Sequence, residues 1–83
     1  MDAEVVRSFI TRLADVFEAD PSTVQPDFPL EERWDSVAVL GTIALIDEQF
    51  GVTVPPEELT RCASVAAVLA LVGQSIDQRS SGR

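Results

Sequence analysis

The sequence predicts an all-α fold, a small four-helix bundle with three substantial helices and a short third one. Hydrophobic residues make up 46% of the 83 residues, which favours a compact domain over a disordered chain. Apolar side chains recur at three- and four-residue spacing in three stretches, which is the periodicity of a helix. Neither an internal repeat nor a pair of strands is visible, and the length leaves room for one core.

The first helix is expected over residues 3–18. One face of that helix collects its apolar side chains, and Asp2 and Glu4 suit its positive N-terminal end. The segment is therefore amphipathic, with a core-facing and a solvent-facing side. The core-facing residues are Val6, Phe9, Ile10, Leu13, Val16 and Phe17, and the opposite face carries Arg7, Thr11, Arg12 and Asp15.

Residues 20–33 are expected to form a long loop, because Pro21, Pro26 and Pro29 prevent a continuous helix there. One helical turn is expected near residues 22–24. A long free loop is unusual in so small a domain, so apolar residues of the loop are expected to hold it against the core. These residues are Val24, Phe28 and Leu30.

The second helix is expected from Ser36 to Phe50, with Gly51 as its C-terminal cap. After a short extended link, Pro56 is expected to open a brief helical turn that ends at Leu59. Several apolar residues of the second helix are assigned to the core. They are Val39, Leu40, Ile43, Ile46 and Phe50.

Ser64 is expected to cap the last helix. The residues after this helix are polar and end in Ser-Ser-Gly-Arg, which predicts a flexible C-terminal tail over residues 78–83. Residues 1–77 are thus predicted to form the folded domain. The inward stripe of the last helix consists of Val65, Val68, Leu69, Val72 and Ile76.

The chain is strongly acidic, with 14 acidic residues, six arginines, no lysine and a formal net charge of −8. Phosphate backbones and anionic membranes repel such a chain, so neither nucleic acid nor a membrane is an expected partner. Proteins with basic patches are the favoured partners, and their association should weaken as salt is added.

The single cysteine, Cys62, has no partner for an internal disulfide, which fits a reducing compartment. The N-terminus lacks the features of a signal peptide, and no apolar run is long enough to span a bilayer. We expect a cytoplasmic protein, and a monomer. Cys62 is interpreted as small apolar filling, and Trp34 as an anchor that holds the end of the long loop to the core.

Autonomous catalysis is not expected from this composition. Without histidine, the chain can form neither a Ser-His-Asp nor a Cys-His arrangement. Trp34 and Ala38 stand where a nucleophile elbow around Ser36 would have glycines. One cysteine and no histidine also disfavour a transition-metal site. The protein is therefore interpreted as a non-enzyme on which other enzymes act.

Asp35 and Ser36 open the second helix, and two interpretations of this pair stay open. Either residue can cap free amides at the helix start, although Val39 stands where a capping box would have Glu or Gln. Alternatively, Ser36 is a place where a group is attached. A second apolar strip on this helix, expected to lie exposed near Ser36, favours a docking role. Its residues are Val37, Gly41, Ala44 and Leu45.

Three segments are informative in their order along the chain. They are Trp34-Asp35-Ser36-Val37, Ile46-Asp47-Glu48-Gln49-Phe50-Gly51-Val52 and Val54-Pro55-Pro56-Glu57-Glu58-Leu59. In these segments and in its helical layout, the chain resembles the acyl carrier protein family from about Glu4 to Ile76. The dipeptide Asp-Ser carries little information by itself, but its place at the start of the second helix is specific.

The resemblance implies a carrier of thioester-linked acyl groups. Ser36 would receive 4′-phosphopantetheine from coenzyme A through a phosphopantetheinyl transferase, and Asp35 would position the serine or the magnesium ion of the transferase. Further partners would be an acyl- or aminoacyl-loading enzyme, a ketosynthase or an acyltransferase with basic docking patches. These partners would recognise Val37, Gly41, Ala44, Leu45, Asp47, Glu48 and Glu58.

Departures from the family pattern bear on the pathway. Residues 36–46 hold no acid, whereas many fatty-acid carriers have acids along the second helix. A dedicated pathway, such as polyketide or other natural-product synthesis, is therefore favoured over bulk fatty-acid synthesis. The alternatives are a peptidyl carrier, although the Gly-Gly that often precedes its serine is missing, and an unmodified helical adaptor. Phosphorylation of Ser36 ranks below these.

Overall fold

The computed structural model of the protein describes residues 2–81, with side chains described for residues 2–78. It contains α1 (Ala3–Val16), a short 3₁₀ helix η1 (Pro21–Thr23), α2 (Ser36–Phe50), α3 (Pro56–Leu59) and α4 (Val65–Ser81). Within the described range, the only β-type pairing is an isolated antiparallel bridge between Pro29 and Ser64. The predicted all-α fold, with a short third helix and a long first loop, is confirmed.

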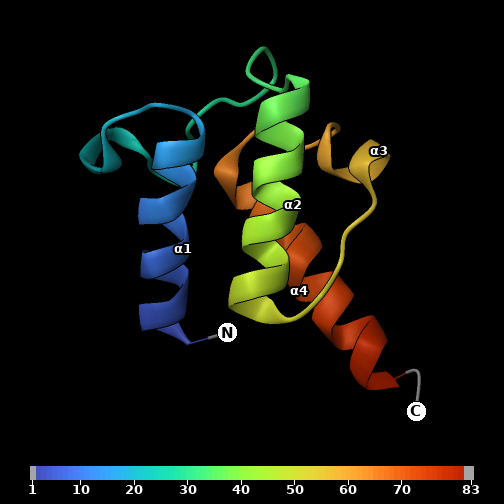
Figure 1. The fold of residues 1–83 in the computed structure, drawn as a ribbon. Helices are drawn as coiled ribbons and strands as arrows, with labels where there is room; N and C mark the ends of the chain where they lie inside the picture. Colours follow the sequence, from blue (N-terminus) through green and yellow to red (C-terminus); the bar gives the residue numbers. More distant parts are fainter. Residues whose placement is uncertain (1, 82–83) are drawn as a thin grey trace.

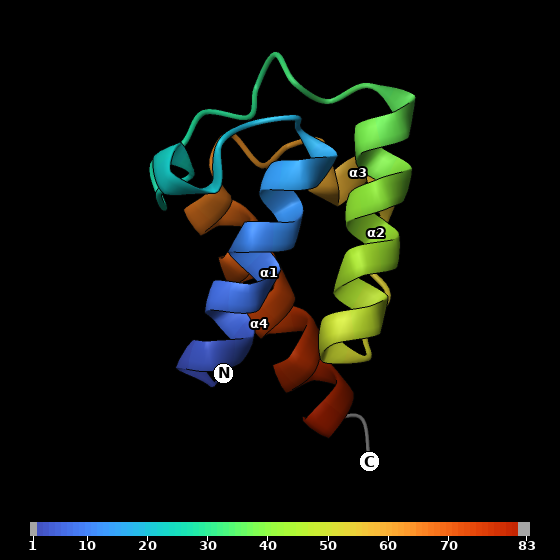
Figure 2. The same cartoon turned by 60° about the vertical axis from the view of Figure 1, so that its left-hand side comes forward.

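The helices surround a single core, as Figures 1 and 2 show from two sides. α1 and α2 lie side by side and run in opposite directions, and α4 crosses behind them. The loop between α1 and α2 spans the end of the bundle at which α2 begins. The start of α1 and the last turn of α4 lie at the opposite end, so the beginning of α2 is well separated from both.

α1 forms because its apolar residues fall on one face and Asp2 caps its start. The Asp2 carboxylate accepts a hydrogen bond of 2.9 Å from the backbone N–H of Glu4. Phe9 and Leu13 are fully buried. The Phe9 ring also packs edge-on against Phe50 of α2, with 5.2 Å between the ring centroids. The amphipathic character predicted for this helix is therefore present in the fold.

The end of α1 is a hydrogen-bonded turn that reverses the chain. The backbone N–H groups of Glu18 and Ala19 donate to the carbonyls of Asp15 and Ala14 at 3.1 and 2.8 Å. This pattern is a Schellman motif, which requires a left-handed residue after the helix. Glu18 takes that role with a φ of 54°. The helix therefore ends at Val16, two residues earlier than the periodicity predicted.

The long loop is held against the core, as predicted, and it is also hydrogen-bonded to the start of α4. Val24 and Leu30 are buried in the core, and Phe28 is partly buried against it. The Leu30 N–H donates to the Ala63 carbonyl at 2.9 Å, and the Ala66 N–H donates to the Pro26 carbonyl at 2.8 Å. These backbone bonds stabilise a segment that has little regular structure of its own.

Trp34 anchors the end of this loop. Its indole N–H donates a hydrogen bond of 2.8 Å to the carbonyl of Cys62. Its ring packs edge-on against Phe17, with 5.2 Å between the centroids. A partly buried indole thus has both its apolar ring and its polar N–H satisfied, which is the arrangement that tryptophan favours. The prediction that Trp34 anchors the loop agrees with these contacts.

The buried face of α2 differs from the predicted one. Leu40 is 68% exposed, so its assignment to the core was wrong. The helix is aliphatic on nearly all sides, and its packing against α1 decides which side turns inward. The buried residues are Ala38, Thr42, Leu45 and Ile46, and the partly buried ones are Val39, Ile43 and Phe50.

The last two helices begin as the sequence predicts. Pro56 is the first residue of α3, and the Ser64 hydroxyl accepts a hydrogen bond of 3.2 Å from the Ala67 N–H at the start of α4. α4 continues to Ser81, because neither glycine nor proline interrupts residues 77–81. The helix therefore extends past the predicted boundary at residue 77. Residues 82 and 83 of the predicted tail lie outside the described residues.

The left-handed position after α1 yields a stability prediction. Glycine adopts this conformation without steric cost, whereas Glu and Ala do not. We expect Glu18→Gly to be more stable than Glu18→Ala by roughly 0.5–1 kcal/mol, which is about 4 °C in melting temperature. Both variants remove the same carboxylate, so the difference between them isolates the backbone. Equal melting temperatures would contradict the left-handed turn.

Candidate functional site

Ser36 is the first residue of α2 and lies exposed at the end of the bundle where the long loop arrives. The preceding residue, Asp35, has an extended backbone with φ −109° and ψ 177°, which breaks the chain direction immediately before the helix. Within the part of the chain that the structure describes, no hydrogen bond engages the Ser36 hydroxyl. This hydroxyl is therefore accessible and is not needed to hold the helix start together.

Asp35 is the residue that caps α2. Its Oδ1 accepts a hydrogen bond of 2.7 Å from the Ala38 N–H, and its carbonyl accepts one of 2.9 Å from the Val39 N–H. The first amides of a helix lack partners inside the helix and give this end a partial positive charge. A phosphate ester on Ser36 would lie at that positive end, which is where proteins commonly bind anions. The residues present thus fit a phosphodiester on Ser36.

The exposed surface next to Ser36 is apolar. Val37 is 75% exposed and Leu40 is 68% exposed, and Ala44 is exposed one turn beyond Leu40. We call Val37, Leu40 and Ala44 the apolar strip. α2 carries no charged side chain before Asp47, so the strip continues from the first turn of the helix to its last turns. Large exposed aliphatic side chains that lie together indicate an interaction surface.

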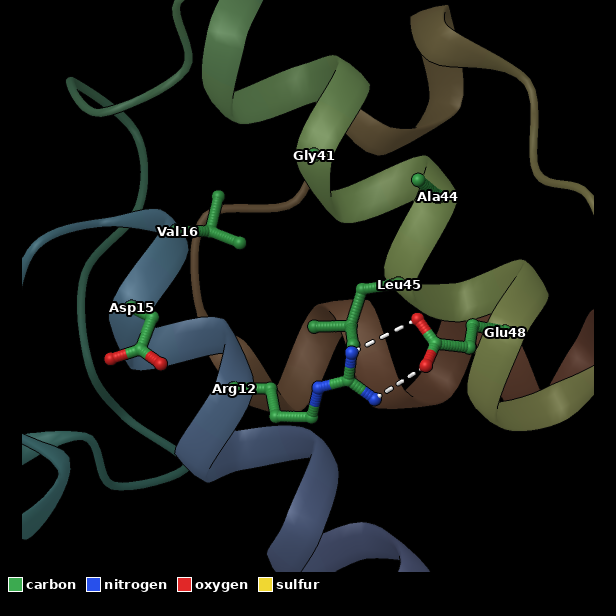
Figure 3. A pocket seen from close by; sticks show the side chains of 7 residues that line it. All are labelled: Arg12, Asp15, Val16, Gly41, Ala44, Leu45 and Glu48. Carbon is green, nitrogen blue, oxygen red and sulfur yellow. Dashed lines mark hydrogen bonds and ion pairs between the residues drawn. The ribbon is translucent and has the colours of Figure 1, made fainter.

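Two residues that were predicted to belong to the exposed strip lie elsewhere. Leu45 is only 5% exposed and points from α2 toward α1 (Figure 3). Gly41 also faces α1, where a Cβ atom on it would lie 3.3 Å from Cγ1 of Val16. A glycine here lets the two helices approach closely. The prediction that Leu45 is exposed is therefore wrong, because α1 covers that side of α2.

Among the acidic residues assigned to partner recognition, Glu48 is already paired within the chain. Both of its carboxylate oxygens accept hydrogen bonds of 2.9 Å from the guanidinium of Arg12, as Figure 3 shows. The hydrogen bonds and the charge of Arg12 lower the pKa of Glu48, and the same contacts raise the pKa of Arg12. The other two acidic residues, Asp47 on α2 and Glu58 on α3, lie exposed. Arg12 was predicted only to face solvent, and its role as the partner of Glu48 was missed.

Two shallow hollows lie along the seam between α1 and α2. One of about 270 Å³ surrounds Gly41 and is bounded by the pair of Arg12 and Glu48 (Figure 3). The other, of about 390 Å³, lies beside the start of α2 and includes both neighbours of Ser36, Asp35 and Val37. Val16 lines both hollows. Their surfaces mix apolar and charged groups.

Cys62 has the properties of a structural residue. It is buried, and its thiol donates a hydrogen bond of 3.6 Å to the carbonyl of Glu58. Burial raises the pKa of the thiol, and the nearby charge of Glu58 raises it further. The thiol is the unreactive form, so a raised pKa opposes a nucleophilic role. The interpretation of Cys62 as interior filling agrees with this geometry.

The fold and the site define a class of protein, a small helical domain that presents one accessible serine at the start of a helix. The family model described as the phosphopantetheine attachment site matches residues 7–72, and the protein belongs to this family. The family covalently carries a 4′-phosphopantetheine prosthetic group. No curated protein and no solved structure matches the chain. The resemblance seen in the sequence and the predicted cofactor are therefore confirmed.

Two further findings concern the described residues as a whole. No helix among them combines the length and the hydropathy of a membrane-spanning segment. No group of three or more metal-ligating side chains lies together in that part of the chain.

The pair of Arg12 and Glu48 yields a pH prediction. Because the pKa of Glu48 is lowered in the folded state, its contribution is present above the usual glutamate pKa and is lost as the pH falls through the lowered value. We expect Glu48→Gln to lower the melting temperature slightly at pH 7 in low salt. The difference from the wild type should shrink as the pH falls below the usual glutamate range, and it should also disappear in about 1 M salt.

Thermal melts of Glu57→Gln provide the control for this prediction. Glu57 is an exposed carboxylate on α3, so its removal changes the net charge by the same amount. If the two variants respond identically to pH and salt, the pairing with Arg12 does not stabilise the fold.

Proposed function

We propose that the protein carries thioester-linked acyl intermediates on a 4′-phosphopantetheine arm attached to Ser36, in a dedicated biosynthetic pathway. One observation carries this proposal above the others. Within the family match, Ser36 is the first residue of α2, and its hydroxyl is exposed and makes no hydrogen bond in the described part of the chain, whereas the hydroxyl of Ser64 caps α4 and that of Ser22 donates to Asp20. A hydroxyl in that position is open to modification and is not needed for stability.

In the attachment step, Ser36 Oγ forms a bond to the pantetheine phosphate while the pyrophosphate bond of coenzyme A breaks. Adenosine 3′,5′-bisphosphate leaves, and the hydroxyl proton passes to the transferase, because this chain has no histidine to accept it. When attached, the arm supplies a terminal thiol that forms thioesters with acyl groups. The non-catalytic role of the chain follows, since the transferase and the loading enzymes do the chemistry.

Asp35 has a positioning role in this proposal. Its Oδ1 holds the Ala38 N–H and thereby sets the geometry of the helix start that presents Ser36. Its second oxygen remains for the magnesium ion of the transferase. The capping bond and the metal contact use different oxygen atoms, so one side chain can serve both purposes.

The apolar strip is the proposed docking surface. Partner enzymes would cover Val37, Leu40 and Ala44, and their basic residues would meet Asp47 and Glu58 at the edges. Leu45 and Gly41 contribute indirectly, since they hold α2 on α1. A docking surface with aliphatic residues along α2 and no acid over residues 36–46 supports a dedicated pathway over bulk fatty-acid synthesis.

Attachment at Ser36 is tested by intact mass. We expect a broad-specificity phosphopantetheinyl transferase, with coenzyme A and magnesium, to add one phosphopantetheine to the apo protein. Ser36→Ala should gain no mass, and Ser22→Ala, which changes another exposed serine, should be modified like the wild type. A wild-type chain that stays unmodified while a known carrier is modified in the same tube would favour the adaptor.

The docking surface is tested with the same transferase as the partner. We expect Leu40→Gln to lower the kcat/KM of modification about tenfold, which corresponds to ~1.4 kcal/mol of lost apolar contact. The melting temperature should change little, since Leu40 is not part of the core. Ala70→Gln, which changes an exposed residue of α4, is the control and should modify normally. An unchanged kcat/KM for Leu40→Gln would show that Leu40 is not part of the docking surface.

A further inference from the structure

Thr42, in the middle of α2, has a buried hydroxyl without a partner. The residue is 0% exposed, and its Oγ1 is the single buried side-chain oxygen or nitrogen of the described residues that makes no hydrogen bond. A threonine inside a helix commonly donates to the carbonyl four residues earlier, which here is the carbonyl of Ala38. That bond is not formed. The hydroxyl is therefore desolvated without compensation.

An uncompensated buried hydroxyl lowers the stability of the fold, and a small domain has little stability to spare. Valine has nearly the same shape and no hydroxyl, so it would fill the same space without this cost. On α2, the buried neighbours of Thr42 are Ala38, Leu45 and Ile46, whose side chains carry no polar atom. The arrangement indicates that a hydrogen-bonding group reaches Thr42 from outside the chain.

The position of Thr42 relative to Ser36 makes an arm on Ser36 a candidate for that group. Six residues separate them, so Thr42 lies about 9 Å further along the helix axis. At 100° per residue, Val39 lies between the two residues on the surface of α2, and Ile43 lies beside Thr42, one position further along the helix. Both are aliphatic and only partly buried. An arm attached to Ser36 would reach Thr42 by displacing side chains that have no polar atoms.

We propose that the Thr42 hydroxyl forms a hydrogen bond with a carbonyl or hydroxyl oxygen of the loaded arm when it folds against α2. This proposal rests on the proposed attachment at Ser36. Two sources offer the same chemistry, namely the amide groups of the arm and an oxygen on the acyl cargo. In the second case the preferred cargo is a 3-hydroxyacyl or 3-oxoacyl group, because a saturated chain has no oxygen beyond the thioester and would leave Thr42 unpaired.

The first test uses the apo protein. We expect Thr42→Val to raise the melting temperature of the apo form by about 4 °C or more, because it removes an unpaired buried hydroxyl. Thr42→Ser keeps the hydroxyl and should show no such rise. Thr53→Val, which changes an exposed threonine, is the matched control and should leave the melting temperature unchanged. Failure of Thr42→Val to stabilise the apo form would show that the hydroxyl is already satisfied and would overturn the proposal.

The second test compares loaded forms of the wild type, Thr42→Val and Thr53→Val. A phosphopantetheinyl transferase transfers the arm from coenzyme A, butyryl-coenzyme A or 3-hydroxybutyryl-coenzyme A, and intact mass verifies each product. If the cargo supplies the oxygen, the 3-hydroxybutyryl form of the wild type should melt about 4 °C above the butyryl form. That difference should vanish in Thr42→Val and persist in Thr53→Val.

If an amide of the arm supplies the oxygen, all three loaded forms of the wild type should be stabilised equally relative to Thr42→Val. Identical shifts on loading in the wild type and in Thr42→Val would overturn the contact while leaving the attachment intact. Absence of the mass gain would overturn the proposed function, and this proposal with it. The movement of the Thr42 methyl signal in NMR spectra on loading provides a second readout that does not depend on stability.

Discussion

The close packing of α2 onto α1 determines which residues of the molecule are available for interaction. Gly41 faces Val16 at a distance that leaves little room for a larger side chain, and Leu45 fills the seam below them. Because α2 is held in this rotation, Ser36 and Leu40 turn outward. An apolar helix such as α2 has no polar face that would orient it by itself, so the contact with α1 is the constraint on which the site depends.

A second set of contacts holds the start of α2 in place. The loop that precedes Ser36 is tied to the segment before α4 by the bonds of Leu30 to Ala63 and of Trp34 to Cys62. These contacts join residues that lie about thirty positions apart in the chain, so they connect the loop before α2 with the segment before α4 near the candidate site. The Asp35 cap then sets the first turn. The serine is therefore exposed at a helix start that hydrogen bonds hold in place, which suits the proposed attachment.

Prediction from the sequence was correct for features that neighbouring residues determine. It was wrong or incomplete for features that depend on contacts between residues far apart in the chain. Helix starts and ends at Asp35, Gly51 and Pro56 follow from capping and proline geometry, which are local. The rotation of α2 was misjudged, because Leu40 and Leu45 are equally apolar and only the packing against α1 distinguishes them. The pairing of Arg12 with Glu48 and the burial of Thr42 were missed for the same reason, since both depend on tertiary packing.

The position of Trp34 makes it an intrinsic fluorescent probe of the start of α2. The chain has one tryptophan and no tyrosine, so excitation near 295 nm, roughly the red edge of indole absorption, selects a single residue two positions before Ser36. The indole is hydrogen-bonded and packed against Phe17, so its emission responds to the polarity and the rigidity around it. Events at the start of α2 are thus readable by fluorescence without any introduced dye.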